Sequence, residues 1–264
     1  MKDVSVKAGR RRNWSGIALV IALCIFWQAS VSSGLVVSPN WPALSTVLRA
    51  MLEGFSSGEW ITVFGSSLYR MMTGYFLGCA AGITVGVLLA TNRTVQAIFG
   101  PTLELLRPIP IPAVIPPLIF ILGVDNTLKI FVIAFSVFFP VLISTHSGVL
   151  AVDPLHMQVA RTFRLPTVRR VLRVQLPSAI PYVLTGMRTS LALSLIVTVI
   201  AEMIAGSEGI GYYIVSMQYA MRAADMYAAV LMLSAIGYLL NTIFVALEAR
   251  AIRWARQNEE RMKQ

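Results

Sequence analysis

The residues of this chain that could carry out chemistry are few, and they form no catalytic pattern. The sequence contains no GxxxxGK[ST] phosphate-binding loop, no GxSxG motif and no HExxH motif. Its two histidines, His146 and His156, have no second ligand at metal-binding spacing. Its two cysteines, Cys24 and Cys79, lie inside apolar segments, where cysteine behaves as a small core residue. We therefore expect no metal site, no disulfide and no nucleotide bound by the chain itself.

Six ionisable residues lie in or beside the apolar body of the chain, where a charge is costly and is by default a functional candidate. They are Arg70, Glu104, Arg107, Arg188, Glu202 and Glu248. Arg70 and Arg188 lie near the ends of apolar segments, so we expect their side chains to reach the interface. Glu202 lies about 6 Å of helix rise from Gly206. This position leaves two interpretations open, an interfacial residue or one that lines a pathway.

The most basic stretch between the termini is 153–177, with five arginines. Asp153 can cap a short helix and Pro154 fits its first position, where a missing N–H costs nothing. Leu155, Val159 and Phe163 recur every four residues and form a narrow apolar stripe. The helix from Leu155 to Arg164 would be about 15 Å long, too short to cross a bilayer. It can dock into a groove on a partner or lie on an anionic membrane surface, and both interpretations are open.

A second short helix is expected in the same stretch. Pro166 can start it, and its apolar positions share one face. Pro177 is expected to end it, because proline cannot continue the hydrogen-bond ladder.

Composition indicates a membrane protein. Of the 264 residues, 56% are hydrophobic and 13% are charged, against about 25% charged in soluble domains. The net charge of +10 does not indicate nucleic acid, because the charges cluster beside apolar runs. We expect an all-α membrane protein with six spans. The expected spans are 15–34, 66–90, 109–123, 127–149, 189–206 and 226–247.

The remaining segments are expected as tails and loops around one transmembrane domain, 15–249. The basic tail 1–14 resembles the start of a signal peptide, but no cleavage site follows, so the first span is expected to be retained. The loop 35–62 holds a short helix at 43–54, and 207–225 is a loop. The C-terminal tail is 250–264.

Two spans have unusual composition. The span 66–90 carries Gly74, Gly78, Gly82 and Gly86, a four-residue repeat that lets another helix approach closely, within the chain or in a second copy. The span 109–123 contains several prolines and cannot be one straight helix, which makes it a candidate pathway lining. The candidate pathway residues are Pro112, Pro116, Pro117, Ser194, Thr198 and Glu202.

The distribution of positive charge predicts the orientation. Seventeen of the 22 lysines and arginines fall in the two tails, the stretch 153–177 and the loop after the second span, and three fall on the opposite side. Positive residues accumulate on the cytoplasmic side of a membrane. We therefore expect both termini and the stretch 153–177 in the cytoplasm.

This stretch resembles the EAA loop of the membrane permease subunits of binding-protein-dependent ABC importers. That signature reads Glu-Ala-Ala, three residues, Gly, nine residues, Ile, one residue, Leu-Pro. The corresponding residues are Gln158-Val159-Ala160, Arg164, Val174 and Leu176-Pro177. Further motifs (VDP at 152–154, LPSAIPYVLTGMR at 176–188, GIGYYI at 209–214 and LRPIPIPAVIPPLIF at 106–120) are similar to the nitrate, sulfonate and taurine branch. The resemblance covers about 35–255.

The resemblance implies a type I ABC importer permease fold with six transmembrane helices in the bacterial inner membrane and a cytoplasmic coupling helix between spans 4 and 5. It implies a permease homodimer in lipid, a separate ABC ATPase subunit that binds ATP and Mg, and a periplasmic or lipid-anchored substrate-binding protein. No cofactor is bound by the chain itself. The coupling residues would be Leu155, Gln158, Val159, Ala160, Arg161, Phe163, Arg164, Leu176 and Pro177.

Two positions depart from the signature. Gln158 replaces glutamate, and Arg164 replaces a glycine that allows a left-handed turn between the two short helices. A non-glycine residue in that conformation costs about 1 kcal/mol.

Three other classes of membrane protein would each require different features. A gradient-driven secondary transporter would need an ion site or a buried acid at the midplane. A membrane-embedded enzyme would need a polar catalytic cluster, and a scaffold would transport nothing. For a permease of this branch, sulfonate-like or nitrate-like anions are expected first, although related subfamilies also move neutral heterocycles.

Overall fold

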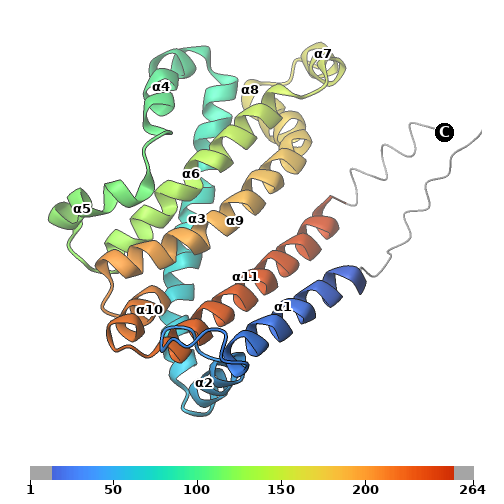
Figure 1. Ribbon diagram of the computed structural model, residues 1–264. Coiled ribbons are helices and arrows are strands. Elements are labelled where there is room, and N and C mark those ends of the chain that lie inside the picture. The colour runs from blue at the N-terminus through green and yellow to red at the C-terminus, as the bar shows by residue number, and fades with distance from the viewer. Residues whose placement is uncertain (1–13, 253–264) are drawn as a thin grey trace, which may run out of the picture.

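The computed structural model describes residues 14–252, and in this part of the chain every regular element is a helix (Figure 1). The elements are α1 (Trp14–Ser32), α2 (Leu44–Ser56), α3 (Glu59–Thr91), α4 (Arg93–Leu106), α5 (Ile111–Leu122), α6 (Asn126–Leu150), α7 (Pro154–Thr162), α8 (Thr167–Arg170), the π-helical turn η1 (Val171–Gln175), α9 (Leu176–Ala205), α10 (Ile210–Tyr219) and α11 (Ala223–Ala251). The expected tails 1–14 and 250–264 lie almost entirely outside the described residues.

The centre of the fold is the packing of α3 and α9 on α6. The glycine repeat of α3 faces α6, and a Cβ atom added at Gly78 would lie 2.5 Å from the Ala134 carbonyl oxygen. At Gly82 and Gly86 the nearest carbonyl oxygen of α6 would lie at 2.8 Å. Only hydrogen fits there, so the backbones approach as the repeat predicted. The helix that packs on it belongs to the same chain.

The expectation of six spans is confirmed only in part. Four helical units of the described residues are long and apolar enough to cross a membrane: α3, α6, α11 and the continuous rod Thr167–Ala205. A fifth candidate is the pair α4 and α5, which is bent by 101°. The helix α1 is apolar, but its tested part, Gly16–Ser32, is shorter than the other candidates. The short helix expected at 43–54 is present as α2.

The expectation that Pro177 ends the second short helix is wrong. The chain stays helical from Thr167 to Ala205, with α8, η1 and α9 forming one rod. Within η1 the Leu176 N–H donates to the Val171 carbonyl, five residues back. This widened turn immediately precedes Pro177, so the missing N–H of the proline falls where the hydrogen-bond register changes. The span expected to begin at 189 is therefore part of a helix that begins before it.

The proline-rich segment also differs from expectation. Pro116 and Pro117 lie inside α5, which is helical from Ile111 to Leu122, while Pro112 occupies its first turn, where no N–H is needed. The break lies before α5, at residues 107–110, where the chain turns sharply away from α4.

The expected loop 207–225 contains a helix, α10. Gly209 takes a left-handed φ of +101°, and α10 begins at the next residue. Ile210 and Tyr213 are buried, and the Tyr213 ring lies 5.4 Å from that of Trp60, edge to face. This burial stabilises a ten-residue helix that is too short to be stable in isolation.

Candidate functional site

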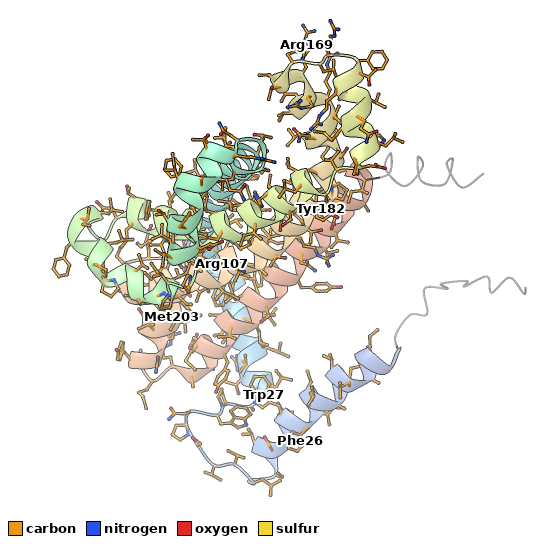
Figure 2. The ribbon with its side chains drawn as sticks, turned by 90° about the horizontal axis from the view of Figure 1, so that it is seen from above. Phe26, Trp27, Arg107, Arg169, Tyr182 and Met203 are labelled. Atoms are coloured by element: carbon orange, nitrogen blue, oxygen red, sulfur yellow. The ribbon has the colours of Figure 1, made fainter. Side chains whose placement is uncertain are left out.

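The arm formed by α7 and α8 projects from one end of the bundle. Figure 2 shows Arg169 at the tip of this arm, and Met203 near the opposite end of α9. Tyr182, on the same helix, lies near the arm. The rod Thr167–Ala205 thus joins the arm directly to the far side of the bundle.

The short helix α7 begins as the sequence predicts. The Asp153 side chain accepts a hydrogen bond from the Leu155 N–H at 2.8 Å, and Pro154 occupies the first helical position. The helix ends at Thr162, two residues earlier than expected, which gives a length of about 13 Å at the usual rise.

The apolar stripe of α7 is exposed along its whole length. Leu155, Val159 and Phe163 are 61%, 47% and 75% exposed, whereas the neighbouring Ala160 is buried. The polar Gln158 and Arg161 are also exposed. The helix therefore presents three large apolar side chains, with polar and basic neighbours, that the described part of the chain leaves largely uncovered.

The continuous segment of η1 and the start of α9 faces α7 across a groove. A cavity of about 520 Å³ lies between the two elements, and Val159, Phe163, Val174 and Pro177 contribute to its lining. Leu176, next to Pro177, is half-buried. The residues corresponding to the two ends of the family signature thus lie together, and a groove separates them.

Arg164 adopts the left-handed conformation expected at the position of the signature glycine, with φ +49°. Its N–H donates to the Arg161 carbonyl at 2.8 Å, and the Leu165 N–H donates to the Ala160 carbonyl at 3.0 Å. These two bonds form a Schellman motif that ends α7. The departure from glycine therefore keeps the turn and retains its conformational cost.

Replacing Arg164 with glycine should stabilise the protein by up to about 1 kcal/mol, because glycine adopts a positive φ without steric cost. The apparent melting temperature in detergent measures this effect. Met221, which also has a positive φ of +57°, offers a matched comparison, since Met221→Gly should shift stability in the same direction. A lower melting temperature for Arg164→Gly would show that the arginine side chain contributes more than its backbone costs.

A second feature is a pair of cavities at the bend between α4 and α5. The larger, about 400 Å³, lies among this bend, α6 and α9. The smaller, about 240 Å³, lies between α4 and α6. Arg107, at the C-terminal end of α4 and labelled in Figure 2, is among the residues that line each of the two cavities. From α9, the larger cavity is lined by Thr189, Leu193 and Val197.

The pathway residues expected from sequence do not line these cavities. Ser194, Thr198 and Glu202 are 0–1% exposed, on a different face of α9 from the one that lines the larger cavity. Ser194 and Thr198 donate their hydroxyl protons to carbonyls of their own helix. Pro112, Pro116 and Pro117 are exposed on α5.

Glu202 belongs to a buried ionic cluster. Its Oε1 accepts from Arg70 Nη1 at 2.8 Å, with both side chains at most 1% exposed. Its Oε2 accepts from the Ser67 hydroxyl at 2.8 Å and from the Gly211 N–H at 3.0 Å. Glu202 therefore ties α3, α9 and the start of α10 together. The expectation that the Arg70 side chain reaches the interface is wrong, since it is 1% exposed and bound to Glu202.

The cluster includes residues that sequence reasoning missed. Arg70 also binds Asn126, at 2.6 Å from Nε to Oδ1, and pairs with Glu208. Lys129 is buried beside these charges. The sequence did contain a signal for an ion pair: Arg70 and Glu202 lie in separate apolar spans, and a buried charge requires a partner. It did not identify the pair, because the two residues lie 132 positions apart.

A family model described as the binding-protein-dependent transport system inner membrane component matches residues 82–257. The SsuC protein of Bacillus subtilis (strain 168), which carries the name of an aliphatic sulfonates transport permease, is 31% identical over 97% of this chain and 94% of its own length. The bicarbonate transport system permease protein CmpB of Synechococcus elongatus is 30% identical over 94% of this chain and 92% of its own length.

A solved structure of the MetNI methionine ABC transporter, in an inward-facing conformation, has a TM-score of 0.62 with 20% identity. The match covers 71% of this chain and 94% of that one. At this identity the similarity concerns the fold.

Proposed function

The chain belongs to the family of binding-protein-dependent transport system inner membrane components, and we infer from this that it couples the import of a small anion to ATP hydrolysis by a separate ATPase subunit. It is a membrane permease subunit of an ABC importer for small solutes. We propose a coupling element, a substrate class, an orientation in the membrane and a set of partners.

The observation that carries the proposal is the exposed apolar stripe of α7. Three exposed apolar side chains at a spacing of four residues, on a helix with a capped start and a hydrogen-bonded end, suit a groove on a partner. A membrane surface is the other occupant that the sequence left open. The docking interpretation is favoured because the family implies an ATPase partner.

Force applied at α7 has a direct route into the bundle. The helix joins the rod Thr167–Ala205 through a short turn, and the far end of that rod is bound to α3 and α10 by Glu202. A displacement of the arm would therefore move α9 as a rigid element. We propose that ATP and Mg, bound by the ATPase, drive this displacement.

The substrate class follows from the relatives. One carries a name for aliphatic sulfonates and another for bicarbonate, and both solutes are small anions. A cavity whose one charged lining residue among those described is Arg107 suits an anion. We propose a small organic or inorganic anion, such as a sulfonate, taurine or nitrate, as the solute.

The proposed assembly has two copies of this chain, two ATPase subunits and a substrate-binding protein on the side away from α7, in the bacterial inner membrane. Both termini would lie in the cytoplasm with α7. In Figure 1 the end of α11 points toward the same end of the bundle as α7, which agrees with this orientation.

Replacing Val159 and Phe163 together with aspartate should abolish uptake and the stimulation of ATP hydrolysis by the loaded binding protein. The two side chains are exposed, so the melting temperature of the permease should change little. Co-purification with the ATPase and uptake into proteoliposomes measure the effect.

The control is the double variant Val159→Leu and Phe163→Leu, which keeps the stripe apolar and should retain the complex. Normal uptake and ATPase binding by the aspartate variant would exclude α7 as the coupling element.

A further inference from the structure

The cavity at the α4–α5 bend has the properties of a small-ligand site. At about 400 Å³, it lies within the range of about 300–1,000 Å³ found for ligand pockets, which combine apolar walls with a few placed polar groups. Its walls are mainly the apolar side chains of α5, α6 and α9. Three hydroxyl groups, from Ser136, Ser144 and Thr189, are set among them.

The charge in this cavity comes from one residue. Arg107 is the single charged side chain among the described residues that line it. Within residues 14–252, no carboxylate lies within ion-pair distance of the Arg107 guanidinium. Glu104, one helical turn earlier, lines only the smaller, neighbouring cavity. An anion in the larger cavity would therefore meet a cation that is not neutralised by a protein partner.

The hydroxyl groups differ in their availability. Ser136 donates its proton to the Ile133 carbonyl and Thr189 donates to the Thr185 carbonyl. Among the hydrogen bonds of the described residues, Ser144 donates to no protein acceptor, so its O–H can point into the cavity. The guanidinium fork and one hydroxyl then provide donors on two sides of a bound oxyanion.

We propose that Arg107, assisted by the Ser144 hydroxyl, forms an anion-binding subsite within the permease, specific for small oxyanions of the sulfonate or carboxylate class. The subsite rests on the proposed function, because it assumes that an anion passes this cavity. Arg107, at the C-terminal end of α4, is exposed and lines the cavity together with residues of α5, α6 and α9. The planar guanidinium binds two oxygens of such a group at once, which a lysine does not reproduce.

The test uses proteoliposomes that contain the permease, its ATPase and a loaded binding protein. Uptake of radiolabelled ethanesulfonate and bicarbonate is compared for the wild type, Arg107→Gln and Arg107→Lys. Arg107→Gln should lower uptake by about tenfold or more, as expected for the loss of hydrogen bonds to a charged group. Arg107→Lys should recover part of it, because the charge remains while the fork is lost.

Two readouts separate this effect from a structural one. The ATP hydrolysis stimulated by the binding protein should stay within about twofold of the wild type in Arg107→Gln, since the α7 arm is unchanged. Arg93→Gln, at the exposed start of α4, removes the same charge away from the cavity and should transport normally.

The outcomes distinguish this inference from the proposed function. If the wild type takes up either anion and Arg107→Gln does so equally well, the subsite is excluded while the anion importer stands. If Arg107→Gln loses stimulated ATP hydrolysis together with uptake, the arginine acts structurally and the subsite is excluded. If the wild type takes up neither anion, sulfonate and bicarbonate are excluded as solutes, and the inference, which names the sulfonate and carboxylate class, is excluded with them.

Discussion

Replacement of Arg70 with methionine should lower the free energy of unfolding by about 3–5 kcal/mol, the usual cost of leaving a buried charge without its partner. The Glu202 carboxylate on α9 would stay fully buried against α3, and its Oε1 would lose the hydrogen bond from the guanidinium. The Asn126 contact would also be lost. Thermal unfolding in detergent, followed by circular dichroism, measures the difference.

A second variant tests the physical reason. The double change Arg70→Met and Glu202→Gln removes both charges but keeps an oxygen that accepts from Ser67 and Gly211. It should recover a large part of the lost stability, since replacing a buried pair costs far less than breaking it. Glu208→Gln is the matched control, because that side chain is 60% exposed, and it should cost little. A double variant no more stable than Arg70→Met would show that the lost stability comes from packing and not from the unpaired charge.

The second large effect is expected from the glycine repeat. Gly78→Ala would place a methyl group 2.5 Å from the Ala134 carbonyl oxygen and 2.8 Å from the Val137 Cβ. Backbone cannot move aside as a flexible side chain does, so α3 and α6 must separate. We expect a loss of about 1–3 kcal/mol, typical of overpacking, in spite of the better helix propensity of alanine.

Gly65, in the same helix, provides the control. A Cβ atom at Gly65 would meet nothing within 4 Å, so Gly65→Ala should be neutral or stabilising by up to about 1 kcal/mol. Relative to the wild type, the melting temperature should therefore fall for Gly78→Ala and stay equal or rise for Gly65→Ala. Equal shifts would mean that the close approach of α3 and α6 is not what requires glycine at position 78.

Local features of the fold were predictable from the sequence, because each depends on residues close together in the chain. The start of α7 follows from Asp153 and Pro154, and the apolar stripe from the spacing of Leu155 and Val159. The left-handed turn at Arg164 followed from the family signature. The long helices α3, α6 and α11 followed from hydropathy.

The candidate site was predictable only on the arm formed by α7 and α8. Its residues are contiguous, so a short signature identifies them. The cavity at Arg107 is built from α4, α5, α6 and α9, and a one-residue change in the face assigned to α9 exchanges Thr198 for Val197. Hydropathy does not resolve which face of a wholly apolar helix turns toward a cavity, because polar and apolar sides are scarcely distinct.

What the sequence alone determined about this protein is its class, its long helices and the short capped helix α7, because hydropathy, capping and the spacing of apolar residues act over a few residues. The tertiary structure alone decided the continuity of the rod through Pro177, the helix α10, the partner of Arg70 and the cavity face of α9. The rod continues because η1 changes the hydrogen-bond register just before Pro177, and each of the other features depends on contacts between segments distant in the chain. A buried ion pair such as Arg70–Glu202 forms only where folding brings two spans together, and burial gives α10 the stability that its length does not.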